Sequence, residues 1–443
     1  MYAGLSLDQA PPILVPFRFF LTAPLFALLA GLMLLYLGPD LLQTRWSLPM
    51  LGFTHAMTLG FLGMIMCGAL FQMLPVVAGA PVRNERLVAL IVHALLTSGT
   101  ALLVGGFVFA NTLAFKFAIP FLAVGFLVMI VAIARSLLAA PRSHDTVRGM
   151  RIAVIGLTIT VALGVYLGAA YAWGIPLARG VLTNLHLSWG LLGWVATLVV
   201  VVAYQVVPMF QMTPEYPVRL RRFLAMAIFI ALCALTLVEI LAPDLSLSLL
   251  LKATVAICLT VFSVWTLILQ TRRRRKLPDV TLDFWRLGTV SLILAILWWV
   301  AGQFGGSWVH SNRYELVLAL LFIGGFALSV VNGMLYKIVP FLVWLHLQNR
   351  LLADVSMVGA AVPNMKQILP DRRCRYQLKA QVLAIVLLFF TIVWDGILAR
   401  PAAVLFVVSY SLLAANLVFA WRIYLREARR LDQLAYNTNS GSA

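Results

Sequence analysis

The sequence predicts an all-α polytopic membrane protein of about twelve transmembrane helices, arranged as three pseudo-threefold arcs of four helices. Of its 443 residues, 63% are hydrophobic and 11% are charged, whereas a soluble domain is roughly half apolar and about a quarter charged. Apolar runs long enough to cross a bilayer, about 20 residues each, follow one another along the chain. Because backbone groups in lipid must be satisfied within the segment, such runs are helices. The two-residue alternation of a membrane barrel strand is absent.

We expect twelve spans within a single transmembrane domain, residues 1–443. Their boundaries follow the apolar runs at 15–37, 50–77, 86–109, 113–139, 151–174, 184–210, 223–242, 246–270, 286–304, 315–342, 379–399 and 402–425. The longest loop is expected to run from Trp344 to Leu378. Residues 426–443 begin as a basic stretch and are expected to end in a disordered cytoplasmic tail from Asn437.

The basic residues, which give a formal net charge of +18, lie in the hydrophilic gaps between the apolar runs. With the N-terminus in the cytoplasm, all but six of the 33 Lys and Arg residues fall on the cytoplasmic side; the exceptions are Arg45, Lys116, Arg179, Lys252, Arg313 and Arg400. This asymmetry follows the positive-inside rule, so both termini are predicted to be cytoplasmic. The expected partner of these charges is the lipid bilayer. Nucleic acid is not expected, because no basic groove with interleaved aromatic residues is present.

An internal repeat of about 132 residues runs through the chain. The second, sixth and tenth spans end in similar patterns, Phe71-Gln72-Met73-Leu74-Pro75, Tyr204-Gln205-Val206-Val207-Pro208 and Tyr336-Lys337-Ile338-Val339-Pro340. A glycine stands 15 residues before each proline, at Gly60, Gly193 and Gly325. The repeats are predicted at approximately 13–140, 148–271 and 283–425. Since each holds an even number of spans, they share one orientation and are related by an axis along the membrane normal.

The repeated residues have a structural interpretation. Glycine permits the close approach of helices in lipid, and each proline is expected to mark the cytoplasmic end of its helix. The polar side chains Gln72, Gln205 and Lys337 are then expected to satisfy the backbone carbonyls that proline leaves unpaired.

The first eighty residues carry a more specific pattern. Pro16-Phe17-Arg18-Phe19-Phe20 opens the first span, and the second span region contains His55-Ala56-Met57, Gly60, Gly68, Leu74-Pro75 and Gly79. In these residues the chain resembles the NnrS family, haem- and copper-associated membrane proteins linked to nitric oxide tolerance. Twelve spans in three arcs, with both ends inside, also resemble subunit I of the haem–copper oxidase superfamily, which includes nitric oxide reductases. The resemblance implies a bacterial-type inner membrane as the location.

The resemblance also implies roles for two histidines, His55 and His186. In the oxidases, the second span carries a ligand of the low-spin haem, where His55 stands. The sixth span carries the first ligand of the copper or iron site, where His186 stands. His55 lies 20 residues before Pro75 and His186 lies 22 before Pro208, a height difference of about 3 Å at the helical rise per residue. We therefore expect both imidazoles in one outer-leaflet layer, with His55 as a ligand of haem b and the other axial position empty or filled by methionine.

The remaining ligands of an oxidase are missing. The seventh span (223–242) and the tenth span (315–342) hold no histidine, so a centre that reduces dioxygen or nitric oxide lacks its ligand set. Motifs of soluble enzymes, such as a phosphate-binding loop or a nucleophile elbow, are also absent. The chain is therefore not expected to be an enzyme. We expect it to bind at most one haem b, for one-electron transfer or for handling haem or nitric oxide beside a respiratory or redox membrane partner.

Two alternatives stay open: a transporter of copper or a small solute, and a structural subunit of a respiratory complex that has lost its cofactors. The second span holds soft ligands of the kind that suit Cu(I), namely His55, Met57, Met64, Met66, Cys67 and Met73. Copper is nevertheless disfavoured, because Met66 and Cys67 turn away from Met57 and Met64, and methionine commonly fills gaps in apolar packing.

A proton-coupled transporter usually needs a carboxylate deep in the bundle. Glu239 and Glu315 instead lie near the outer ends of their spans. Glu239 is expected to form an ion pair with Lys252 across a short turn.

Overall fold

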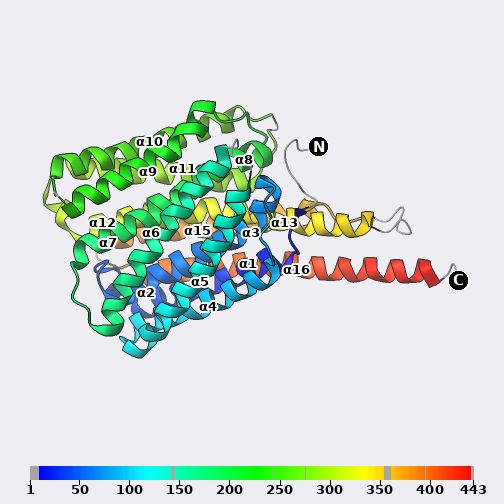
Figure 1. The fold of residues 1–443 in the computed structure, drawn as a ribbon, viewed down its shortest axis with the longest axis horizontal. Coiled ribbons are helices and arrows are strands. Elements are labelled where there is room, and N and C mark those ends of the chain that lie inside the picture. The colour runs from blue at the N-terminus through cyan, green and yellow to red at the C-terminus, as the bar shows by residue number, and fades with distance from the viewer. Residues whose placement is uncertain are drawn as a thin grey trace.

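The computed structural model describes residues 9–140, 145–241, 243–274, 276–353, 361–394 and 396–440. Within these ranges the chain is helical, without strands, and twelve helices are long and apolar enough to cross a membrane. The helices lie roughly side by side in one bundle, and the first helix begins at the same end at which the last one finishes (Figure 1). We call this the terminal end. The predicted fold class is confirmed, and the chain is a multi-pass membrane protein.

The elements follow one another in twelve spans. The first four consist of α1 (Leu14–Leu37) with the 3₁₀ helix η2 (Gly38–Leu42); α2 (Leu48–His55), η3 (Ala56–Gly63) and α3 (Met64–Ala78); α4 (Glu85–Val108); and α5 (Thr112–Ala139). The next four consist of α6 (Asp145–Trp173); α7 (Arg179–Ser188), η4 (Trp189–Ala196) and α8 (Thr197–Gln211); α9 (Val218–Leu241); and α10 (Leu245–Thr271). The last four consist of α11 (Val280–Gln303) with η5 (Ser307–His310); α12 (Asn312–Ala319), η6 (Leu320–Ala327) and α13 (Leu328–Leu352); α15 (Asp371–Val393), preceded by the short α14 (Met365–Ile368); and α16 (Ala399–Ser440).

Several predicted boundaries are wrong, chiefly near the terminal end. There α6, α9, α11 and α15 begin five to eight residues before the starts expected at 151, 223, 286 and 379; at the opposite end, α15 ends at Val393 instead of 399. The expected loop from Trp344 to Leu378 is shorter, because α13 continues to Leu352 and α15 begins at Asp371. α16 continues as helix to Ser440, where a disordered tail is predicted from Asn437; residues 441–443 lie outside the described ranges. Hydropathy marks only the apolar part of such helices. Arg, Lys and Gln are good helix formers, so α13 and α16 extend beyond the bundle (Figure 1).

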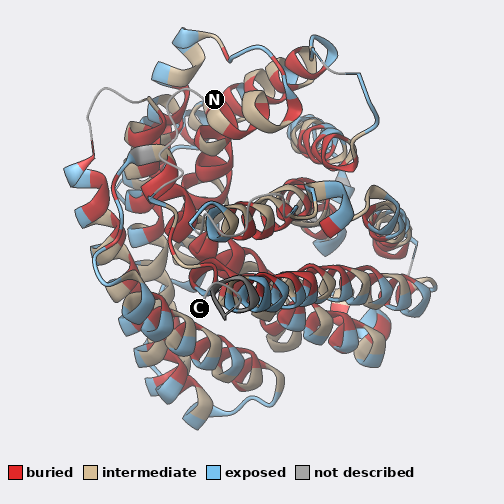
Figure 2. Ribbon diagram, turned by 90° about the vertical axis from the view of Figure 1, so that its right-hand side faces the viewer, coloured by how far each residue is buried: buried red, intermediate tan, exposed pale blue. Residues whose placement is uncertain are grey.

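The second, sixth and tenth spans form the centre of the bundle. In their most apolar windows 83%, 72% and 67% of the residues are buried, against 28–50% in the other nine spans. Those nine pack in chain order into a closed ring, in which α5 meets α6, α10 meets α11, and α16 returns to α1. Figure 2, viewed from the terminal end, shows the buried faces of the surrounding helices turned towards the interior.

Each central span is interrupted by a π-helical segment. The segments η3, η4 and η6 are each eight residues long. They begin 19, 19 and 20 residues before Pro75, Pro208 and Pro340, respectively. A π turn holds an additional residue and often marks a functional site. The internal repeat stays a prediction, and the matched positions of the three π segments accord with it.

The glycines of the repeated pattern lie where helices approach closely. A Cβ atom at Gly60 would lie 2.3 Å from Phe26 of α1, and one at Gly325 would lie 2.5 Å from Ser291 of α11. At Gly193 the approach is made by α6, because a Cβ at Gly156 would lie 2.4 Å from the Gly193 carbonyl oxygen. In all three cases the central span therefore packs against the span that precedes it in the chain.

Candidate functional site

His55 and His186 lie together between two central spans. His55 is the last residue of α2, and His186 lies in α7, three residues before η4 begins. Their ring centroids are 6.3 Å apart, and the ring planes are inclined by 21°. The sequence predicts one level for the two imidazoles, and the structure also makes them neighbours. Both lie in the half of the bundle away from the terminal end, since α1 runs from that end and α2 follows the turn at the other.

Hydrogen bonds fix the tautomer of both rings. His55 Nδ1 lies 2.8 Å from the Leu51 carbonyl oxygen, and His186 Nδ1 lies 3.0 Å from the Thr160 carbonyl oxygen. A carbonyl only accepts, so each Nδ1 carries a hydrogen and donates it. A neutral imidazole then keeps a lone pair on Nε2. Neither Nε2 is hydrogen-bonded to a described residue, so both lone pairs are free to bind a ligand.

Aromatic side chains from three outer helices form a cluster beside His55. Phe107 of α4 stacks on His55, with ring centroids 5.4 Å apart. Phe115 of α5 and Tyr171 of α6 pack against Phe107 and against each other, at centroid distances of 4.9–5.4 Å. His55 therefore packs against an aromatic cluster, and the Arg179 guanidinium lies over the Tyr171 ring of that cluster, 5.2 Å from its centroid.

Helix α6 positions His186 in two ways. Thr160 accepts the hydrogen bond from Nδ1, and Gly164, one turn further along, leaves room for the ring. A Cβ at Gly164 would lie 2.9 Å from His186 Cε1. This distance is too short for a side chain larger than glycine unless the imidazole moves.

An arginine ties the three central spans together at the same end of the bundle. Arg45, in the turn before α2, donates from Nη2 to Asn184 Oδ1 at 3.0 Å and pairs through Nε with Glu315 Oε2 at 2.7 Å. Asn184 is two residues from His186, so this contact also fixes the start of α7. The predicted ion pair between Glu239 of α9 and Lys252 of α10 is confirmed, with Lys252 Nζ 3.0 Å from Glu239 Oε1.

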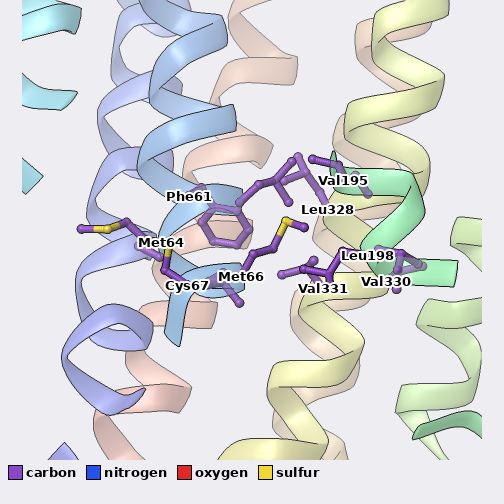
Figure 3. Close-up of a cluster of buried hydrophobic side chains, with 14 of the residues drawn as sticks. Phe61, Met64, Met66, Cys67, Val195, Leu198, Leu328, Val330 and Val331 are labelled. Atoms are coloured by element: carbon purple, nitrogen blue, oxygen red, sulfur yellow. The ribbon is translucent and has the colours of Figure 1, made fainter. Parts of the chain in front are cut away.

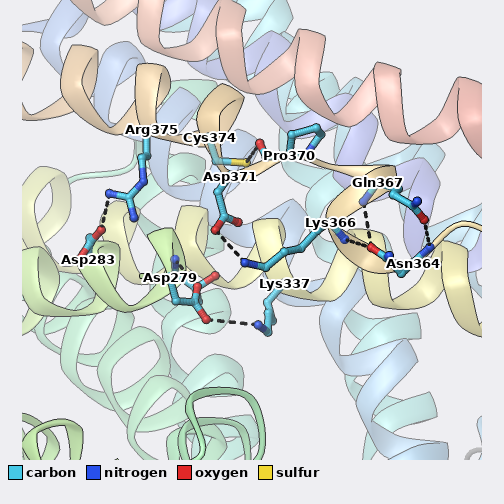
Figure 4. Close-up of polar contacts among 11 residues, drawn as sticks. Asp279, Asp283, Lys337, Asn364, Lys366, Gln367, Pro370, Asp371, Cys374 and Arg375 are labelled. Carbon is cyan, nitrogen blue, oxygen red and sulfur yellow. Dashed lines mark hydrogen bonds and ion pairs between the residues drawn. The ribbon is translucent and has the colours of Figure 1, made fainter. Parts of the chain in front are cut away.

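The residues of the repeated pentapeptides lie towards the terminal end, and the structure corrects part of their interpretation. α3 and α8 end three residues after Pro75 and Pro208, but α13 continues twelve residues past Pro340. Lys337 Nζ lies 3.3 Å from Asp279 Oδ2 and forms an ion pair rather than binding a freed carbonyl (Figure 4). Neither Gln72 nor Gln205 donates a hydrogen bond to a described residue, and Gln72 Oε1 is buried without a partner among those residues. The proposed carbonyl-satisfying role is therefore not what the structure shows.

The ion pair of Lys337 belongs to a charged layer at the terminal end of the last four spans. Asp283 of α11 pairs with Arg375 of α15 at 2.9 Å, and Lys366 pairs with Asp371 at 3.4 Å (Figure 4). Opposite charges are paired in this layer, so it holds the helix ends together.

A group of neutral polar side chains, missed in the sequence, is buried between α13, α15 and α16. Gln381 Oε1 accepts hydrogen bonds from Asn332 Nδ2 at 2.7 Å and Gln377 Nε2 at 3.1 Å. Gln381 Nε2 donates to Ser329 at 2.9 Å, and Gln377 Nε2 donates to Ser409 at 2.9 Å. Hydropathy gives no sign that these residues meet, because they come from different helices, and Gln377 lies in the polar stretch before the expected eleventh span.

Replacing the central member of this group should destabilise the bundle. In Gln381→Leu, the amide of Asn332 and the hydroxyl of Ser329 lose their partner inside an apolar bundle, at a cost of about 1–3 kcal/mol for a buried unpaired group. Thermal unfolding of the purified protein in detergent measures the effect. Gln303→Leu is the matched control, because the Gln303 side chain is exposed and bonds only to the Trp299 carbonyl. Equal melting temperatures for the two variants would contradict the expected role of the group.

The histidine pair offers two nitrogen donors and no anionic ligand. Among the described residues, no three His, Cys, Asp or Glu side chains lie close enough together to hold a metal ion. Two neutral imidazoles suit a metal that brings most of its other ligands with it.

The fold and this site define a polytopic α-helical membrane protein with an imidazole pair inside the membrane bundle. The family model described as NnrS protein matches residues 12–278, more than half of the chain, and the chain therefore belongs to the NnrS family. The matched region includes both His55 and His186 and ends just before α11. No curated protein sequence matches the chain.

Proposed function

We propose that this NnrS-family protein binds one haem b between His55 and His186, for one-electron transfer or for handling haem or nitric oxide in a bacterial-type inner membrane. The terminal end faces the cytoplasm in this proposal, as the distribution of basic residues predicts. The observation that carries it is the 6.3 Å separation of two imidazole rings whose Nε2 atoms have no described partner.

The separation of the rings fits a metal held from both sides. If each Nε2 lay about 2 Å from a shared metal, the ring centroids would be roughly 6 Å apart. Haem iron accepts histidine as a ligand, so His55 and His186 are the residues that would hold the haem. The surrounding Phe107, Phe115 and Tyr171 supply an apolar environment suited to a macrocycle. When bound, the haem would supply the capacity for one-electron transfer.

The chain's own residues orient and tune the two ligands. The carbonyls of Leu51 and Thr160 hold the Nδ1–H groups, which directs the Nε2 lone pairs and raises their basicity. Arg45, through Asn184 and Glu315, restrains the spans that carry the ligands. A respiratory or redox membrane partner would exchange the electron.

The proposal is tested on full-length protein purified in detergent. Addition of haemin is expected to give a Soret band with the spectrum of a low-spin, six-coordinate haem, at one haem per chain. A preparation that stays colourless after haemin addition would overturn the proposal. In that case, cells that accumulate copper or a small solute only when they express this protein would support the transporter instead.

Crowding His186 should weaken the site without removing a ligand. In Gly164→Ala the added Cβ forces the imidazole away from Thr160, and loss of a group that orients a ligand typically lowers affinity about 10- to 100-fold. Titration with haemin measures this change. Gly180→Ala, on the same helix as His186, is the control because a Cβ there meets nothing within 4 Å. Equal haemin affinity for both variants would show that Gly164 does not position the ligand.

A further inference from the structure

A cavity of about 70 Å³ lies where the three central spans meet, towards the terminal end from the histidine pair. Its walls come from α3, α8 and α13, with Phe20 of α1 and Trp285 of α11 completing them. Figure 3 shows Met66 extending from α3 towards Val330 and Val331 of α13 and Leu198 of α8, whereas Met64 points the other way. The cavity is thus separate from the imidazoles, since Met66 follows His55 by eleven residues, or roughly 16 Å of helix.

The walls of the cavity are apolar. Its lining includes valines and leucines from all three central spans and three methionines, Met66, Met73 and Met334. The one polar hydrogen among the lining side chains, on Trp285 Nε1, is directed to Met334 Sδ at 3.2 Å. A buried water needs two to four polar partners, and apolar cavities without them stay dry. Water is therefore a poor occupant.

The size of the cavity restricts the occupant further. Protein interiors are close-packed, and an unfilled void is destabilising. A volume of about 70 Å³ admits a diatomic molecule. Methionine side chains adapt their shape to irregular gaps, so the wall can close around such a guest.

We propose that this central cavity is a binding site for a small apolar gas molecule of the dioxygen type. Such molecules dissolve in the bilayer core and reach the bundle interior without crossing water. The site stands independently of the haem proposal, because it uses none of the residues around His55 and His186.

Dioxygen is a suitable probe because it is paramagnetic and broadens the resonances of nearby methyl groups. The full chain, labelled with ¹³C at the methionine methyls, is studied by NMR under increasing dioxygen pressure. Met66, Met73 and Met334 are expected to broaden more than Met64, Met129 and Met150. These controls are fully buried, with 0% exposure, and do not line the cavity. Equal broadening of the two groups would overturn the proposal.

Filling the cavity provides the second arm of the test. Ala69 lines it, so Ala69→Leu should abolish the additional broadening at Met66, Met73 and Met334 while the control methyls keep theirs. Val202→Leu adds a single methylene from another wall and is used if Ala69→Leu does not fold; it should reduce the same broadening. Persistence of the additional broadening in a folded filled variant would show that dioxygen does not bind there. Because no haem is needed, failure here leaves the haem titration unaffected.

Discussion

His186→Ala is expected to leave the haem-loaded protein with a single axial imidazole. The low-spin spectrum of the wild-type protein should change to that of a five-coordinate, high-spin haem. Affinity for haemin should fall by at least about 10-fold, since loss of a ligand costs no less than loss of a group that orients one. The same change is expected for His55→Ala, because in this proposal both imidazoles, whose ring centroids are 6.3 Å apart, would hold the haem. Absorption spectra recorded during haemin titration measure both effects.

His93→Ala provides the control for this experiment. His93 is also a partly buried histidine in a span, but its Nε2 lies 2.9 Å from the Thr22 hydroxyl, and its ring packs against Phe19. It should bind haem as the wild type does. If His186→Ala kept the low-spin spectrum while His55→Ala lost it, the second ligand would have to come from elsewhere, and the paired site would be wrong.

Gly156→Ala is expected to destabilise the bundle and to weaken the histidine site together. The added Cβ would lie 2.4 Å from the carbonyl oxygen of Gly193 and 3.2 Å from its Cα. Backbone cannot rotate away as a side chain can, so α6 must shift from the sixth span. Overpacking of this kind typically costs about 1–3 kcal/mol. Because α6 also carries Thr160 and Gly164, the shift should displace His186 as well, so both the melting temperature and haemin affinity should fall.

Gly105→Ala separates this packing effect from the general effect of alanine. Gly105 lies within α4, and a Cβ there meets nothing within 4 Å. Alanine favours a helix over glycine by up to about 1 kcal/mol, so this variant should melt at the wild-type temperature or higher. If the Gly156→Ala protein had the same melting temperature as Gly105→Ala, the close contact between α6 and η4 would tolerate a methyl group.

Much of the fold could be predicted because a bilayer imposes simple rules on sequence. Length and hydropathy of the apolar runs correctly predict twelve spans, and most boundaries agree within a few residues. The misses fall where polar side chains continue a helix outside the apolar layer, as in α13 beyond Pro340 and α16 beyond 426. Hydropathy contains no information on where such a helix ends.

The candidate site could be predicted only in part. Counting residues back from the prolines places His55 and His186 at one level, but their rotation about the helix axes decides whether they meet. That rotation depends on the π segments η3 and η4, which no simple period in the sequence reveals. The partners Thr160 and Gly164 lie on a different helix, and Gln381 meets Asn332 across 49 residues of sequence. These contacts depend on packing between spans, and single residues in apolar runs do not show it.

The π segments have a consequence for the evolution of the chain. Successive side chains of an α-helix point about 100° apart around its axis. The additional residue in each π turn therefore changes which way the side chains before the π segment point relative to those after it. Loss of one residue from η3, with return to ordinary α-helix, would swing His55 away from His186 while Met66 stayed facing the bundle axis. Deletion of a single codon would thus separate His55 from His186, while the cavity around Met66 and every outer helix stayed in place. The length of these short segments therefore determines whether the two histidines lie together.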